Sequence, residues 1–285
     1  MTGAGRGLGR EYALSLARHG AKVVVNDLGG NRDGTGADAS PAQEVVDEIK
    51  AAGGEAVANT DDISSWDGAA GLIQQAIDTF GRLDVLINNA GILRDRMVFT
   101  MSEEEWDAVI RVHLKGTFAP SHHAAAYWRE RSKEGETNDA RLINTTSVSG
   151  LYANAGQSNY GAAKAGIAAL TQIAAVELGR YGVTANCIAP GALTRMTGDL
   201  DTIPDEVRAN FAPTWVAPVV TWLASPDSAE VTGQVIEASG VVLAVAEGWH
   251  RGPSSKPVET AEEVGSIVRK LLADARPRTL FNEVS

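Results

Sequence analysis

Tyr160 and Lys164 stand four positions apart, and Ser147 lies thirteen residues before the tyrosine. A spacing of four places the tyrosine and the lysine on one face of a helix, about a turn apart. A tyrosine with a pKa of about 10 is a poor base at neutral pH, but a nearby ammonium group stabilises the phenolate and lowers that pKa. The Ser147 hydroxyl could hydrogen-bond the oxygen of a substrate whose proton the phenol takes. A tyrosine–lysine pair alone can be a surface helix pair, an alternative that Ser147 disfavours.

The chain opens with a loop that holds Gly3, Gly7 and Gly9. Such a loop turns tightly into a helix N-terminus, where free backbone amides and the helix dipole favour a pyrophosphate group. Asp27 ends the next predicted strand, eighteen residues beyond the last glycine. A carboxylate at about this distance binds the ribose of an adenine dinucleotide, although a turn or helix-cap aspartate is the alternative. We therefore expect a dinucleotide site, whose oxidised nicotinamide would further lower the pKa of Tyr160.

Two charged residues near this loop bear on the choice of cofactor. The Asp27 carboxylate should repel the 2′-phosphate of NADP and select NAD. Arg6, in the glycine loop, is the kind of residue that could bind that phosphate. Because the carboxylate opposes the phosphate directly, we expect NAD rather than NADP.

Short apolar segments alternate with helical patterns along the chain. Continuous apolar strands separated by helices are typical of a parallel sheet covered on both faces. We therefore expect an α/β fold, a doubly wound parallel sheet of about seven strands in three αβα layers (a Rossmann fold), with a C-terminal helical extension. The predicted strands cover residues 21–26, 56–58, 83–87, 141–144, 183–188 and 234–237. The predicted helices cover residues 7–19, 40–52, 66–80, 103–130, 158–181 and 215–224.

The two ends of this fold raise separate expectations. A dinucleotide fold has a central strand before its glycine loop, so we expect the native chain to begin about ten residues upstream of Met1, one strand length. Residues 1–250 are predicted to form one Rossmann-type domain, and residues 251–285 a linker and a helix. The apolar spacing within residues 264–272 gives that helix one apolar face, which we expect to pack on the body. Docking on a partner is the alternative.

The 285 residues carry a net charge of −11, and the isoelectric point is near 5.0. An acidic chain argues against nucleic acid and anionic membranes as main partners. The longest aliphatic run, residues 241–246, is far shorter than the ~20 residues that span a bilayer. Cys187 is the single cysteine, so an intrachain disulfide is impossible and a cytoplasmic location fits. No spacing of His and Cys predicts a metal site.

In combination, these motifs resemble the short-chain dehydrogenase/reductase family over roughly residues 2–240. The matching phrases are Thr2-Gly3-x-x-x-Gly7-x-Gly9, Asn88-Asn89-Ala90-Gly91, Ser147, Tyr160-x-x-x-Lys164 and Pro190-Gly191. The resemblance implies a secondary-alcohol oxidoreductase in which Tyr160 is the general acid/base, Lys164 holds the cofactor ribose and tunes the tyrosine, and Ser147 positions the substrate. It also implies that Asp62 and Ile63 flank the adenine. The implied cofactor-binding residues are Gly3, Arg6, Gly7, Leu8, Gly9, Asp27, Asp62, Ile63, Asn89, Ala90, Gly91, Tyr160, Lys164, Pro190, Ala192, Leu193, Thr194 and Arg195.

Within the family, the chain resembles the (3R)-hydroxyacyl-CoA dehydrogenase units of peroxisomal multifunctional enzymes, which are also a type of 17β-hydroxysteroid dehydrogenase. The shared phrases include residues 25–30 (VNDLGG), 88–96 (NNAGILRDR), 111–116 (RVHLKG) and 150–154 (GLYAN). This resemblance implies a 3-hydroxyacyl-CoA substrate with a fatty-acyl or steroid side chain. The alternatives are a 17β-hydroxysteroid dehydrogenase acting on a free steroid, a 3-oxoacyl reductase, and a non-catalytic nucleotide-binding subunit.

Several further positions carry open expectations. His113 stands where many family members have Asn, and it could support a proton-relay water or merely satisfy helix backbone groups. Arg195 stands where many have a threonine near the nicotinamide. We expect His122 and His123 to be helix-surface residues. Family members pair two long helices across a dyad, so the resemblance implies a homodimer or homotetramer, and Ala and Ile on several faces of residues 162–178 allow burial on both sides.

Overall fold

The computed structural model of the chain describes residues 1–31, 33–36, 38–193 and 204–281. Its strands form a two-stranded sheet in the order β1-β2 and a five-stranded sheet in the order β3-β4-β5-β6-β7. Neighbouring strands pair in parallel except for β6 and β7, which are antiparallel. The strand bounds are β1 (Val23–Asn26), β2 (Ala56–Asn59), β3 (Val85–Asn88), β4 (Ala140–Thr145), β5 (Val183–Pro190), β6 (Val235–Ala238) and β7 (Leu243–Val245).

The first residues of the chain lie between the two sheets. The amino group of Met1 donates to the Val24 carbonyl oxygen, and the Asn26 amide donates to the Met1 carbonyl, both over 3.0 Å. On the other side, the Thr2 amide donates to the Ile87 carbonyl over 3.0 Å. The opening residues thus join β1 to β3 at the centre of the fold, and the expected strand upstream of Met1 stays a prediction.

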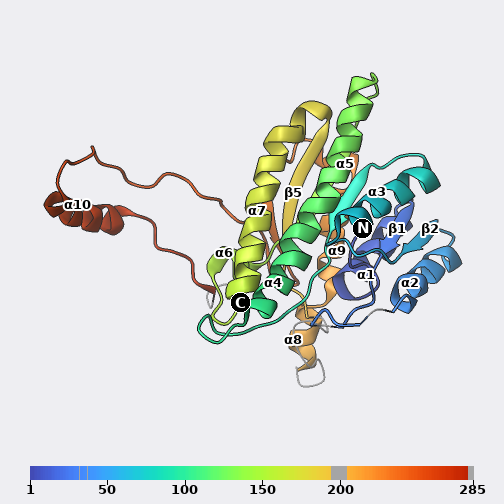
Figure 1. Cartoon of the computed structure of the whole chain (residues 1–285), viewed down its shortest axis with the longest axis horizontal. Helices are drawn as coiled ribbons and strands as arrows, with labels where there is room; N and C mark the ends of the chain where they lie inside the picture. Colours follow the sequence, from blue (N-terminus) through green and yellow to red (C-terminus); the bar gives the residue numbers. More distant parts are fainter. Residues whose placement is uncertain (32, 37, 194–203, 282–285) are drawn as a thin grey trace.

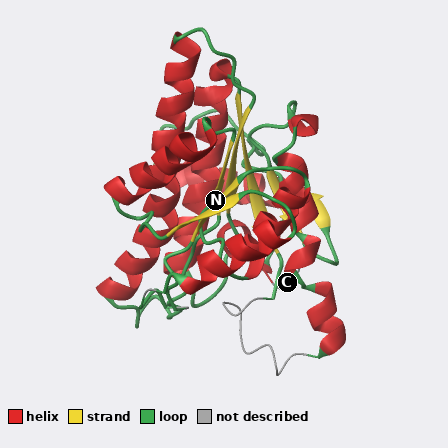
Figure 2. Ribbon diagram, turned by 90° about the vertical axis from the view of Figure 1, so that its right-hand side faces the viewer, coloured by secondary structure: helices red, strands yellow, loops and turns green. Residues whose placement is uncertain are grey.

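Helices cover both faces of the strands, as Figure 2 shows, which confirms the expected three-layer α/β fold. In β4, Ile143 packs into a core cluster with α1, α2 and α9, whereas Leu142 packs into another with α3, α5 and α7. Because both faces are buried, the strands are apolar throughout rather than alternating. The helix bounds are α1 (Gly7–Arg18), α2 (Ser40–Ala51), α3 (Trp66–Phe80), α4 (Glu103–Ile110), α5 (Gly116–Lys133), α6 (Val148–Tyr152), α7 (Ser158–Leu178), α8 (Asp205–Asn210), α9 (Ala217–Leu223) and α10 (Ala261–Asp274). Short turns of other helix types are η1 (Arg111–Lys115), η2 (Gly179–Tyr181), η4 (Pro213–Trp215) and η5 (Pro226–Ser228).

The six predicted strands are found within about two residues of their expected ends, and two details differ from expectation. The predicted helix at residues 103–130 is α4 and α5 joined by the π-helical turn η1, which holds His113. The last strand, β7, is antiparallel because a tight turn precedes it, in which the Ser239 amide donates to the Val242 carbonyl over 2.9 Å. A parallel return needs a crossover of a dozen or more residues.

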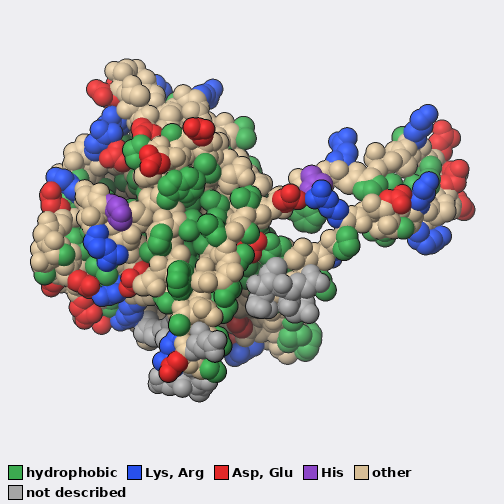
Figure 3. All heavy atoms as spheres, turned by 180° about the vertical axis from the view of Figure 1, so that it is seen from behind, with side chains coloured by type: hydrophobic (Ala, Val, Ile, Leu, Met, Phe, Trp, Pro, Cys, Tyr) green, Lys and Arg blue, Asp and Glu red, His purple; other side chains and the backbone are tan. Residues whose placement is uncertain are grey.

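The C-terminal helix α10 stands away from the body of the molecule (Figure 1). None of its residues is buried, and its apolar residues Val264, Val268 and Leu272 are exposed. The expectation that this face packs on the body is therefore wrong, since the linker at residues 251–257 leads the chain outward. Figure 3, a view from behind, shows the same segment projecting away from the body, with charged side chains along it. The division of the chain near residue 250 stays a prediction.

Candidate active site

A pocket of about 1010 Å³ opens at the carboxyl ends of the strands. It is lined by Asp27 after β1, Asn89 after β3, Thr145 at the end of β4 and Pro190 at the end of β5. In doubly wound α/β folds, ligands bind in the crevice at this edge of the sheet. The volume lies at the upper end of the range for ligand pockets, which suits a dinucleotide together with a substrate.

The glycine loop forms the wall of this pocket where α1 begins. Gly3 and Gly7 have positive φ angles of 60° and 54°, which L side chains rarely adopt. A Cβ on Gly3 would lie 2.6 Å from the Ala90 Cα, and one on Gly9 would lie 2.0 Å from the Gly3 carbonyl oxygen. The glycines therefore allow the loop to fold over the start of α1, whose N-terminal amides suit a pyrophosphate.

Hydrogen bonds fix this loop to the end of β3. The amides of Asn89 and Ala90 donate to the Thr2 hydroxyl over 2.9 and 3.1 Å. The Asn89 side-chain amide donates to the Gly3 carbonyl over 2.9 Å. Thr2 and Asn89 thus hold the two walls of the pocket together, so the loop is preorganised.

Asp27 lies at the carboxyl end of β1 with its carboxylate fixed by backbone amides. Gly5 donates to Oδ2 over 2.8 Å and Gly29 donates to Oδ1 over 2.7 Å. A carboxylate has about four acceptor positions, so it can still accept hydrogen bonds from ribose hydroxyls. Arg6 also lines the pocket. Hydrogen bonds from Ser40 lower the pKa of Asp38, and the charge of Arg6 lowers it further.

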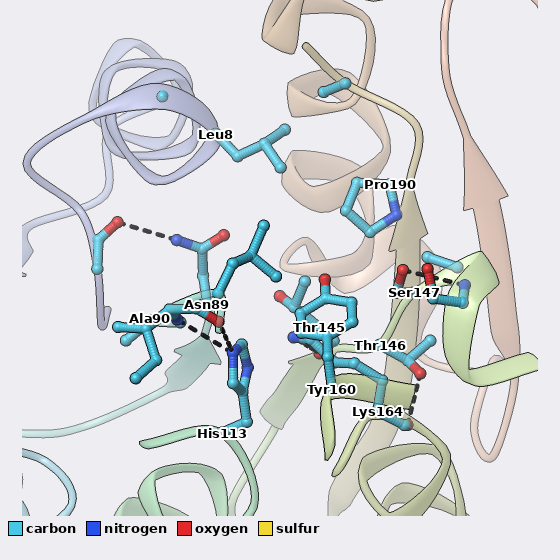
Figure 4. Close-up of a pocket in the computed structure, with 18 of the residues that line it drawn as sticks. Leu8, Asn89, Ala90, His113, Thr145, Thr146, Ser147, Tyr160, Lys164 and Pro190 are labelled. Carbon is cyan, nitrogen blue, oxygen red and sulfur yellow. Dashed lines mark hydrogen bonds between the residues drawn. The ribbon is translucent and has the colours of Figure 1, made fainter. Parts of the chain in front are cut away.

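The three predicted catalytic side chains come together across the pocket from the glycine loop (Figure 4). Ser147 caps α6, and its hydroxyl accepts the Ser149 amide over 3.2 Å. The Lys164 ammonium nitrogen lies 5.5 Å from the centre of the Tyr160 ring and donates to the Thr145 carbonyl over 2.7 Å. The four-residue spacing on α7 therefore places both side chains at one site.

Burial controls the ionisation of the two titratable groups. Desolvation raises the pKa of Tyr160, while a hydrogen bond with the Ser147 side chain works in the opposite direction and the charge of Asp95 raises it further. Desolvation lowers the pKa of Lys164 to about 8. The lysine therefore stays mostly protonated at pH 7 and provides a positive charge beside the phenol.

His113 lies edge-on to Tyr160, with ring centres 5.1 Å apart and an interplanar angle of 89°. Its Nε2 lies 3.0 Å from the amide nitrogen and 2.7 Å from the carbonyl oxygen of Ile92, which follows β3. Its buried Nδ1 has no hydrogen-bond partner among the described residues. Desolvation lowers the pKa of His113 to about 3, so the ring is neutral at pH 7. His113 thus contacts the loop after β3, not only its own helix.

Most predicted cofactor residues line the pocket, and a few do not. Gly9 packs against Gly3 instead, and the Leu193 amide donates to the Phe211 carbonyl over 2.7 Å. Thr194 and Arg195 lie outside the described residues. The predicted residues that line the pocket are Gly3, Arg6, Gly7, Leu8, Asp27, Asp62, Ile63, Asn89, Ala90, Gly91, Tyr160, Lys164, Pro190 and Ala192.

Other residues that line the pocket were not predicted. They include Asp95, Glu237 and Phe281. His122 is exposed and His123 is partly buried, and both rings contact Trp66. In the described ranges, no cluster of His, Cys, Asp and Glu could hold a metal ion. Nor does any described helix have the length and apolar character needed to cross a membrane.

Comparisons with known proteins agree with this geometry. The sequence profile of the short chain dehydrogenases matches residues 1–203. The hydroxyacyl-CoA dehydrogenase ChsB1 of Mycobacterium tuberculosis is 51% identical over 250 residues, 84% of this chain and 76% of that protein. The peroxisomal multifunctional enzyme type 2 of Mus musculus is 43% identical over 95% of this chain, which spans only 34% of that enzyme.

A solved structure supports the same assignment. The crystal structure of a short chain dehydrogenase from Mycobacterium avium superposes with a TM-score of 0.88 and 53% sequence identity. The match covers 98% of this chain and 95% of that one. The chain therefore belongs to the short-chain dehydrogenase/reductase family, whose members use NAD(P), and it is an oxidoreductase that acts on CH–OH groups.

Proposed function

We propose that the chain interconverts a 3-hydroxyacyl-CoA and its 3-oxo counterpart with NAD, and that Ser147, Tyr160 and Lys164 carry the reaction. The observation that carries the chemistry is the meeting of these three side chains in the pocket that the glycine loop also lines. The substrate class rests on two relatives, because ChsB1 is named a hydroxyacyl-CoA dehydrogenase and the mouse relative is a peroxisomal multifunctional enzyme. A free 17β-hydroxysteroid is the comparison substrate.

Each residue of the trio has a role that its hydrogen bonds allow. The Ser147 oxygen accepts the Ser149 amide, so its own O–H can donate to the substrate oxygen. Tyr160 takes the hydroxyl proton as the carbonyl forms, and returns it in the reverse direction. A nicotinamide cofactor, when bound, would supply the hydride acceptor or donor for the carbinol carbon. The charge of Lys164 favours the phenolate, and its N–H bonds beyond the one to Thr145 can hold ribose hydroxyls.

NAD is the proposed cofactor because Asp27 lines the pocket at the carboxyl end of β1, the position that ribose-binding carboxylates take in dinucleotide folds. Two backbone amides fix the Asp27 carboxylate in the pocket wall. The positive charge of Arg6 interacts with another carboxylate, that of Asp38. Asp27→Ala should raise kcat/KM with NADP relative to NAD by about tenfold or more, since it removes one nearby negative charge. An unchanged ratio of the two kcat/KM values would contradict this role.

The test of the substrate class follows NADH formation with each enantiomer of a 3-hydroxyacyl-CoA and with a free 17β-hydroxysteroid, using NAD⁺ and NADP⁺ in parallel. The proposal expects the thioester and NAD⁺ to give the highest kcat/KM. Turnover of the free steroid alone would refute the proposed substrate. Cofactor binding without turnover of any alcohol would favour a non-catalytic subunit.

We also propose that two or four copies assemble through the outer faces of α5 and α7. Ile173 and Val176 on α7 are 54% and 85% exposed, and Phe118 on α5 is 44% exposed. Apolar side chains this exposed on neighbouring long helices suit burial against a second copy. The proposed location is the cytoplasm, where the buried thiol of Cys187 would stay reduced.

A further inference from the structure

Glu237 is the most buried of the acidic side chains that line the pocket, and it has no role in the reaction above. It lies on β6 with 7% of its surface exposed, and its carboxylate lines the pocket. The Tyr152 hydroxyl, at the end of α6, donates a hydrogen bond to its Oε1. Burial raises the pKa of Tyr152, and the hydrogen bond to Glu237 and the charge of Glu237 raise it further.

The neighbours of Glu237 in the sheet leave its carboxylate open to the pocket. The register pairs Glu237 with Ala189 on β5 and with Ala244 on β7, and all three residues line the pocket. Both alanine side chains are too short to cover the carboxylate. Among the described residues, Oε2 accepts no hydrogen bond and Glu237 forms no ion pair. One carboxylate oxygen is therefore held while the other is free for a ligand.

A purely structural role does not account for this arrangement. Placing a carboxylate away from water without a cation is unfavourable, and a glutamine could accept the Tyr152 hydroxyl at lower cost. The helix that ends at Tyr152 begins directly after Ser147 and has five residues. Five residues of helix span about 7.5 Å, so Tyr152, which holds Glu237, lies within about one Debye length of Ser147.

Asp95 is another carboxylate that lines the same pocket. Its Oδ2 accepts the Gln157 side-chain amide over 2.9 Å, and its buried Oδ1 has no partner among the described residues. Its charge acts on Tyr160, because it raises the pKa of that phenol. The half of the pocket that would take the alcohol thus carries two carboxylates. The Lys164 ammonium group in the same half donates to the Thr145 carbonyl and not to either carboxylate.

We propose that Glu237, held by Tyr152, is a specificity-determining residue: its free oxygen accepts a hydrogen bond from a neutral N–H or O–H of the substrate, and its charge excludes substrates that carry a free carboxylate there. The proposal rests on the proposed function, because it places the alcohol substrate in this half of the pocket. It deepens that function by selecting thioesters, whose pantetheine arm carries amide N–H groups, over the corresponding free acids.

The test measures ligand binding to the protein saturated with NADH, so it does not depend on turnover. The ligands are octanoyl pantetheine, methyl octanoate, a methyl ester with a terminal hydroxyl, and octanoate. None of them carries the reacting hydroxyl. Glu237→Gln should strengthen octanoate binding relative to methyl octanoate by about tenfold or more, since one unit charge is removed. Glu237→Ala should weaken the binding of the ligand that donates to Glu237. A weaker affinity for octanoyl pantetheine would identify the amide N–H as the donor, and a weaker affinity for the hydroxyl-bearing ester would identify the O–H. Glu230→Gln, an exposed residue outside the pocket lining, is the matched control.

Tyr152→Phe separates recognition from a merely structural tie. It removes the hydrogen bond to Glu237 but keeps the negative charge, so the exclusion of octanoate should persist. If Tyr152→Phe and Glu237→Gln change the binding ratios alike, the pair only fixes α6 and the proposal is overturned. Ratios within about twofold of wild type in Glu237→Gln would overturn it as well. Failure of the wild type to oxidise any 3-hydroxyacyl-CoA would refute the proposed function instead, and the binding ratios would still decide this proposal.

Discussion

The buried lysine of the site should make the stability of the protein depend on pH in a predictable direction. Lys164 is 3% exposed, and burial lowers its pKa from 10.5 to about 8. Between these values the unfolded chain binds more protons than the folded chain, so stability rises with pH. Each pKa unit corresponds to 1.36 kcal/mol, so burying the protonated lysine costs about 3 kcal/mol. That cost is fully present below pH 8 and is lost as the pH approaches 10.5.

The perturbation is Lys164→Met, which keeps a long side chain and removes the charge. The free energy of unfolding of the wild type minus that of Lys164→Met should increase by about 3 kcal/mol between pH 7 and pH 10.5. Urea unfolding followed by circular dichroism, at four or five pH values, measures this difference. Lys50→Met, on the exposed side of α2, is the matched control and should follow the wild-type pH curve.

Parallel pH curves for the wild type and Lys164→Met would refute the reasoning, because they would mean that burial leaves the affinity of Lys164 for its proton unchanged. The same variant should lose most of its activity, since the phenol then lacks a neighbouring positive charge. A site that keeps a costly buried charge for its chemistry is expected to trade stability for function.

The remaining predictions concern other parts of the fold. Gly9→Ala should weaken NADH binding, measured by fluorescence titration, and should cost roughly 1–3 kcal/mol of stability because its Cβ would meet the Gly3 carbonyl at 2.0 Å. Trp128→Ala should lower the free energy of unfolding in urea by roughly 3–5 kcal/mol, because Trp128 is 1% exposed. Cys187 should resist thiol reagents at pH 8 until the chain unfolds, since burial raises its pKa to about 12. Val176→Asp should lower the mass found by light scattering if α7 joins two copies. Four results would contradict these predictions: Gly9→Ala binds NADH normally, Trp128→Ala unfolds like the wild type, Cys187 reacts while the chain is folded, or Val176→Asp keeps the larger mass.

The parts of the site that follow one another closely in sequence were predictable. Tyr160 and Lys164 share a face because both lie on α7. The glycine loop is adjacent in sequence to the start of α1, which it forms. Local spacing sets these positions, so they could be predicted from the sequence pattern. Asp27 was predictable for a similar reason, because it directly follows β1, the strand after α1.

The parts that were not predictable depend on contacts between distant segments. Tyr152 on α6 and Glu237 on β6 form a hydrogen bond although they lie far apart in sequence, and no pattern links two such residues. The π-helical turn that holds His113 was not predicted, because the helical pattern of the sequence continues through it. The contact of the His113 ring with Ile92 likewise joins residues that no local pattern links. The place of α10 could not be found from its apolar face, because that spacing does not say what the face contacts.

Tyr160 is proposed to exchange the proton of the alcohol, and Tyr160→Phe removes the hydroxyl group that would do so. The measurement is NADH formation from a 3-hydroxyacyl-CoA and NAD⁺, with the dissociation constant for NADH determined on the same sample. NADH binding should be unchanged and kcat should fall by about 10²–10⁴-fold, the contribution of a positioned acid or base. Turnover close to that of the wild type would mean that the reaction uses a different proton acceptor, and Tyr160 would not have this role.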